Sequence, residues 1–139
     1  MYKIYIIAAL LLAVSITSCT RENEVIVPDT SLKGGKKDTT GALIRVTPQF
    51  HEQDIDSCTV YIAYAKDKGV ALASYDEAKL VMIDEGRPRA RFDSLMKGTY
   101  YLYCEGYDKI NKQKVKGGAK FNVVDTTVTT YDLYIQTYP

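Results

Sequence analysis

The feature that most constrains the fold is an alternation of apolar and polar residues, which begins at Gly41 and continues to the end of the sequence. In the clearest stretch, Gly98 to Glu105, Tyr100, Leu102 and Cys104 fall on one face of an extended chain. A period of two is typical of strands with one buried face, and this part of the sequence carries no stripe of the helical period. Residues 41–139 are therefore predicted to form an all-β domain.

Turn residues divide this domain at intervals of about eight to twelve residues, which is the spacing of a sandwich or a small barrel. We expect about seven strands in two antiparallel sheets. Asp76 to Lys79 is the only stretch in which a helical turn is expected. The expected strands cover residues 42–47, 58–64, 70–74, 79–84, 89–93, 98–105, 120–124 and 127–137.

The first residues have the layout of a secretory leader. Lys3 supplies a positive charge, residues 4–14 are all apolar, and the small or polar stretch 15–18 follows. As a helix rising about 1.5 Å per residue, the apolar run would cover about 16 Å of a bilayer core that is roughly 30 Å thick. We therefore expect residues 1–18 to be a cleaved signal peptide and not a transmembrane helix.

The four residues around the expected cleavage site, Ile16-Thr17-Ser18-Cys19, resemble the lipobox of bacterial lipoproteins. The resemblance implies that the Cys19 thiol receives a diacylglyceryl group and that the new amino terminus is acylated after cleavage. These groups together exceed the two lipid signals that stable anchoring takes. In that family the residue after the cysteine influences sorting, and Thr20 favours the outer membrane, with the domain facing the periplasm or the cell surface. An ordinary leader with a chance cysteine is the alternative.

Residues 19–40 are expected to join the lipidated cysteine to a flexible tether. They contain Pro28, the pair Gly34-Gly35 and many charged or hydroxyl residues, without sustained periodicity. Coil statistics give such a tether a reach of about 25 Å. The sequence thus predicts a signal peptide over 1–18, an anchored linker over 19–40 and a β-sandwich over 41–139.

The segment Ala90 to Leu102, followed by Gly106-Tyr107-Asp108, is similar to carboxypeptidase regulatory-like domains and B-type collagen-adhesin repeats of the prealbumin-like group. The shared pattern is a Phe, a Leu, a Gly, an aromatic residue two positions later, and then a Gly-Tyr pair. This resemblance implies an immunoglobulin-like or prealbumin-like sandwich in which Phe92 plugs one end and Tyr100 enters the core. It also implies a noncatalytic module, such as a spacer, an adhesin stalk or a binding accessory.

Charge and composition narrow the choice of partners. The chain has 18 basic and 17 acidic residues, a net charge of +1, and so lacks the basic field that attracts nucleic acid. Its single histidine, His51, is the only candidate general base, and the acidic stretch 51–56 lacks the spacing of a calcium loop and is interpreted as a solvated turn. We expect no catalytic residue, no metal and no cofactor, and we do not expect an enzyme.

Cysteines and tyrosines provide the candidate site residues. Cys58 and Cys104 lie in the apolar phase of two strands, where they form either a disulfide or two buried free thiols. Tyr61, Tyr101 and Tyr103 lie in the opposite phase. They form either an exposed aromatic strip that binds a partner, or packing beneath a loop or the tether.

Basic residues gather in two places. There are two interpretations of these residues. On an exposed hairpin or edge strand they would prevent edge-to-edge pairing of sheets, and alternatively they would form a basic patch that binds an acidic glycan or lipid headgroups. The residues concerned are Arg87, Arg89 and Arg91 on one strand face, and Lys109, Lys112, Lys114, Lys116 and Lys120 in a later run.

These features predict a lipid-anchored, noncatalytic module of the cell envelope that displays a face with Tyr101 and Tyr103 to a protein or glycan partner. An assembly accessory of an adhesin or fimbria-like system is an alternative, and it would have an unpaired sheet edge ready to accept a strand. An enzyme or enzyme inhibitor is a further alternative, and it would bring His51 together with a carboxylate and a nucleophile in one pocket.

Overall fold

The computed structural model describes residues 34–36, 41–127 and 130–139. The expected signal peptide, Cys19 and most of the expected tether lie outside the described residues. The described chain is all-β, as predicted, and has more strands than expected. Its elements are β1 (Ala42–Phe50), β2 (Gln53–Asp54), β3 (Cys58–Tyr64), the 3₁₀ helix η1 (Leu72–Ser74), β4 (Glu77–Leu80), β5 (Met82–Asp84), β6 (Arg87–Leu95), β7 (Gly98–Asp108), β8 (Gln113–Val123) and β9 (Thr130–Gln136).

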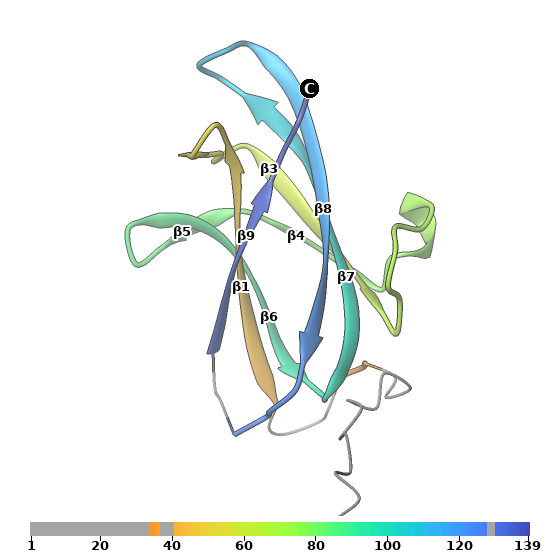
Figure 1. Cartoon of the computed structure of the whole chain (residues 1–139). Helices are drawn as coiled ribbons and strands as arrows, with labels where there is room; N and C mark the ends of the chain where they lie inside the picture. The colour runs from red at the N-terminus through yellow and green to blue at the C-terminus, as the bar shows by residue number, and fades with distance from the viewer. Residues whose placement is uncertain (1–33, 37–40, 128–129) are drawn as a thin grey trace, which may run out of the picture.

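The strands form two sheets (Figure 1). In the four-stranded sheet the order is β4-β3-β7-β8, and every pair is antiparallel. In the five-stranded sheet the order is β2-β1-β6-β5, and β9 lies off this path and also pairs with β1. β9 runs parallel to β1, from Leu43 opposite Thr130 to Gln49 opposite Gln136. This pairing departs from the antiparallel expectation, because alternation along a strand does not specify the direction of its neighbour.

The alternating apolar residues form the core between the sheets. Phe92 and Tyr100, which the family resemblance placed inside, are both fully buried. The Tyr100 hydroxyl accepts a hydrogen bond from the Gly35 N–H (3.0 Å) and donates to the Met96 carbonyl (2.7 Å). Gly35 lies in the stretch that was expected to form the flexible tether. Its hydrogen bond to Tyr100 shows that residues 34–36 of this stretch contact the sandwich where β6 turns into β7. The other main core residues are Ile44, Val46, Val60, Ile62, Leu95, Leu102 and Ile135.

Between residues 70 and 84 the local predictions were wrong. Residues 70–74 contain η1 in place of a strand, and 76–79, expected as a helical turn, lie largely in β4. The expected strand 79–84 is split at Val81, whose N–H donates to the Cys58 carbonyl (3.0 Å) before the chain enters β5 of the other sheet. Short edge strands leave both of their faces partly exposed, so the alternation that marks central strands is weak there.

The β7–β8 hairpin is longer than expected, because β8 begins at Gln113 and pairs with β7 over its whole length without a register shift. Gly117 interrupts the alternation of apolar and polar residues and precedes the strand expected over residues 120–124. In the structure it lies inside β8, where β9 crosses closely: a Cβ atom at Gly117 would approach the Gln136 carbonyl oxygen to 2.2 Å. This glycine therefore permits close contact of two backbones and does not end the strand.

Candidate binding face

The outward side of the four-stranded sheet brings the three predicted tyrosines together. Tyr61 on β3 lies directly opposite Tyr103 on β7, and their ring centroids are 6.0 Å apart. Tyr101, the next outward residue of β7, lies opposite Lys120 of β8. The alternation predicted that these side chains point away from the core, and the strand pairing makes them neighbours.

A fourth tyrosine completes this group. Tyr75 follows η1 in the β3–β4 connection, stacks on Tyr103 with ring centroids 6.0 Å apart, and lies 5.6 Å from Tyr61. All four side chains, including Tyr101, are half-buried, and burial raises the pKa of Tyr75 and of Tyr103. The connection therefore covers part of the strip and leaves part exposed. Tyr75 lies in an irregular segment, so no periodicity could mark it in the sequence.

Lysines of β8 lie on the same side of the sheet. Lys114, Lys116 and Lys120 are exposed and lie opposite outward residues of β7. In the described part of the chain none of the three has an acidic partner within ion-pair distance. Gly118 makes room for the Tyr101 ring, whose hydroxyl would be 2.3 Å from a Cβ atom there. We define the tyrosine–lysine face as Tyr61, Tyr75, Tyr101, Tyr103, Lys114, Lys116 and Lys120.

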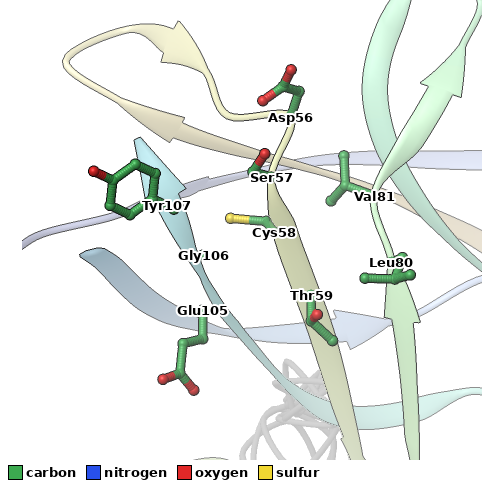
Figure 2. Close-up of a pocket in the computed structure, with 9 residues that line it drawn as sticks. All are labelled: Asp56, Ser57, Cys58, Thr59, Leu80, Val81, Glu105, Gly106 and Tyr107. Atoms are coloured by element: carbon green, nitrogen blue, oxygen red, sulfur yellow. The ribbon is translucent and has the colours of Figure 1, made fainter. Parts of the chain in front are cut away.

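Hollows lie at both ends of this face. One, of about 410 Å³, is lined by Ala65, Asp67, Thr99 and Lys120. The other, which we name the Cys58 groove, has a volume of about 420 Å³. Figure 2 shows Glu105 and Tyr107 along one side of this groove, Leu80 and Val81 along the other, and Cys58 between them. The face thus has a hollow at each end with aromatic side chains between them.

Both cysteines of the domain are buried and free. Cys58 lies opposite Gly106 and Cys104 lies opposite Val60, so the two thiols are diagonal neighbours on adjacent strands. Burial raises the pKa of Cys58 to about 11 and that of Cys104 to about 12, so both thiols stay protonated at neutral pH and are poor nucleophiles. Of the two interpretations offered by the sequence, this arrangement is the pair of free thiols.

His51 lies in the turn between β1 and β2, apart from both cysteines. It lines a hollow of about 450 Å³ together with Glu52 and Thr137. The Thr137 hydroxyl is held by donating to the Gln49 carbonyl (2.9 Å), and the His51 ring packs edge-on against Phe50 with centroids 4.2 Å apart. The hollow thus has an imidazole, the Glu52 carboxylate and the hydroxyls of Thr137 and Tyr138 among its lining residues. The described residues also contain no group of three or more His, Cys, Asp or Glu side chains that could hold a metal ion.

The backbone of the turn that contains His51 is strained, and substitution of the two turn residues tests this strain. His51 (φ 47°) and Glu52 (φ 65°) both have left-handed backbone conformations, which two-residue hairpin turns usually assign to Asn-Gly. The double substitution His51→Asn/Glu52→Gly is expected to raise the free energy of unfolding by about 1–2 kcal/mol. Urea unfolding measures the change, with the exposed substitution Lys68→Asn as a control near zero. An unchanged or lowered free energy of unfolding would contradict the strain.

The outward side of the five-stranded sheet is also charged, but its charges are paired. Arg45 forms two hydrogen bonds to Asp132 (2.7 and 2.9 Å), and Arg87 forms two to Asp54 (2.9 and 2.8 Å). These guanidinium groups hold the pKa of Asp132 and of Asp54 below the usual value. The three arginines of β6 share one face, as predicted, and each has an acidic partner: Arg87 with Asp54, Arg89 with Asp84 and Glu85, and Arg91 with Asp84.

Comparisons with known protein families, with curated proteins and with solved structures found no match. Among the described elements there is no helix with the length and apolar character needed to cross a membrane. The two outer faces of the sandwich differ in how their charges are paired.

Proposed function

We propose that this protein is a noncatalytic binding module of the bacterial cell envelope. Lipid at Cys19 would hold it at the outer membrane, and the tyrosine–lysine face would contact a protein or glycan partner. The observation that carries this proposal is the contrast between the two outer faces. Arginines on one sheet are paired with neighbouring acids, whereas on the other sheet Lys114, Lys116 and Lys120 form no ion pair with a described acid, and Lys120 lies opposite Tyr101.

Aromatic and cationic side chains together favour binding. Tyrosine offers a large apolar ring with a polar hydroxyl and few rotatable bonds, so little conformational entropy is lost when it is covered. In the tyrosine–lysine face the rings of Tyr61, Tyr75 and Tyr103 already support one another, which reduces that cost further. Unpaired lysines add attraction to an acidic partner and lose no internal ion pair when they bind.

The route of the chain is consistent with an anchor at its N-terminal side. Residues 34–36 contact the sandwich beside the β6–β7 turn, where Lys36 bridges to Leu95 (Figure 1). The Cys58 groove lies at the opposite end of the four-stranded sheet, beside Tyr107. A tether that reaches the domain at residue 34 would therefore leave the groove end of the tyrosine–lysine face turned away from the membrane.

Alanine substitution of two tyrosines tests the proposal. In intact cells that express the full chain, Tyr101→Ala/Tyr103→Ala is expected to reduce recovery of the cross-linked partner by about tenfold or more, because aromatic residues dominate such interfaces. The matched control is Tyr134→Ala, since Tyr134 is a 44% exposed tyrosine on the other outer face. Thermal unfolding of each variant reports whether it is folded. Equal recovery by the folded double variant and the wild type would refute the proposed face.

A further inference from the structure

The strand β8 forms one edge of the four-stranded sheet and has unpaired backbone groups. The Lys116 N–H and C=O both bond to Tyr138, each at 2.8 Å, so these groups point away from β7. In an antiparallel strand the direction of the backbone groups alternates, and the β7–β8 register is unbroken as far as Val123. Gly118, Lys120 and Asn122 therefore direct their N–H and C=O groups toward the open edge.

Among the described strands none occupies this edge. β9 lies along β1 of the other sheet and contacts β8 through the Phe121 and Tyr131 rings and close to Gly117, and just after β9 the chain forms a bridge from Tyr138 to Lys116 (Figure 1). Gly118, Lys120 and Asn122 are all exposed. An extended segment placed beside them would thus find a row of backbone donors and acceptors, as in complexes formed by strand addition.

The side chains of β8 select the charge of such a segment. Lysines at alternate positions are about 6.8 Å apart along a strand, which is also the spacing of alternate side chains in a partner strand. A carboxylate on an added strand would lie beside Lys120, which lies within the open stretch and forms no ion pair with a described acid. Lys114 and Lys116 precede this stretch on the same face, where Glu105 lies opposite Lys116. A second copy of β8 paired about the centre of this stretch would instead bring Lys120 against Lys120, which is unfavourable. The edge is therefore protected against self-association and open to an acidic strand.

We infer that the β8 edge from Gly118 to Asn122 binds an extended protein segment with acidic side chains at alternate positions, by adding it to the four-stranded sheet. This inference rests on the proposed function, because it names the partner class of the tyrosine–lysine face. Main-chain hydrogen bonds supply the register, and the lysines supply the preference for acids. Tyr101, whose ring covers Gly118, provides the apolar contact beside the added strand.

A synthetic decapeptide of alternating Glu and Thr is the probe, used with the full chain in detergent micelles. On binding, the amide protons of Gly118, Lys120 and Asn122 are expected to exchange with solvent at least about tenfold more slowly, since they become hydrogen-bonded. A decapeptide of alternating Lys and Thr serves as the matched control and is expected not to bind. Absence of binding by the acidic peptide, or binding without protection of these three amides, would overturn the inference.

Variants separate the contribution of the backbone from that of charge. Asn122→Pro removes an edge N–H without removing a bond to β7, and is expected to weaken peptide binding about tenfold, whereas Asn122→Ala changes it about twofold or less. The double substitution Lys114→Glu/Lys120→Glu is expected to reverse the preference of the protein, so that the Lys-Thr peptide binds more tightly than the Glu-Thr peptide. Circular dichroism checks that each variant is folded. Equal binding by folded Asn122→Pro and Asn122→Ala would overturn the inference.

The same variants distinguish failure of this inference from failure of the proposed function. A cellular partner that is lost with Tyr101→Ala/Tyr103→Ala but retained with Asn122→Pro would refute strand addition and leave the proposed face intact. Polygalacturonate, an acidic glycan, tests the rival explanation that the lysines bind a glycan and not a protein segment. Binding of this polymer at Lys114 and Lys120, with no binding of the acidic peptide, would assign the lysines to a glycan and overturn the inference.

Discussion

Replacing Cys19 by serine is expected to move the protein from the membrane fraction to the soluble fraction of the cell envelope. Each acyl methylene buried in a bilayer contributes about 0.8 kcal/mol, so loss of the proposed acyl groups at Cys19 would remove the main source of membrane affinity. Ultracentrifugation should show the membrane-bound share falling by about tenfold or more. Labelling with a radioactive fatty acid should disappear in the same variant.

The control for this change is Cys58→Ala, which removes a buried cysteine of the domain and should leave the protein on the membrane. Mass spectrometry of the mature wild-type chain provides an independent measurement, since a lipidated N-terminal cysteine has a distinctive mass. An unmodified sulfur, a retained leader or an unchanged distribution of Cys19→Ser would refute the anchor. The β-sandwich and its candidate binding face would be unaffected by that result.

Phe92→Ala is expected to lower the free energy of unfolding by about 3–5 kcal/mol, because it leaves a cavity that a packed core fills poorly. Phe92 is fully buried and lies opposite Ile44 of β1. The ammonium group of Lys79 lies 5.4 Å from its ring centroid, so a cation–π contact is lost as well. Domains are typically stable by about 5–15 kcal/mol, and the variant would lose a large share of that. Urea unfolding at neutral pH measures the difference.

Ile110→Ala provides the comparison, since Ile110 is 70% exposed at the tip of the β7–β8 hairpin. Its effect should remain within about 0.5 kcal/mol, as is usual for surface sites. A cost below about 1 kcal/mol for Phe92→Ala would mean that the two sheets do not pack around this ring as described.

The central strands could be predicted because their two faces differ in burial. The expected strand 58–64 matches β3, and Tyr100, Leu102 and Cys104 of β7 are all buried as their phase indicates. Edge segments could not be predicted in the same way. Leu80, Met82 and Ile83 are apolar yet more than two-thirds exposed, so between residues 80 and 83 residue type does not report which side faces the core.

The candidate face could be predicted only in part. Phase along a single strand placed Tyr61, Tyr101 and Tyr103 outside the core, but it does not determine which strands are neighbours. Pairing of β3 with β7 and of β7 with β8 is a long-range property, and it is what brings the tyrosines and lysines together. Tyr75 joins them from an irregular connection, where no periodic signal exists.

The parallel pairing of β9 with β1 affects how the domain would bear mechanical load. β1 is entered from the N-terminal side, and β9 runs beside it in the same direction from Thr130 to Gln136. Tension applied to the start of β1 and resisted at the end of β9 acts along both strands. The hydrogen bonds between them are then sheared together and do not open one after another. In a domain that is held at its N-terminal end and pulled at its C-terminal end, the hydrogen bonds between β1 and β9 would thus resist mechanical unfolding together.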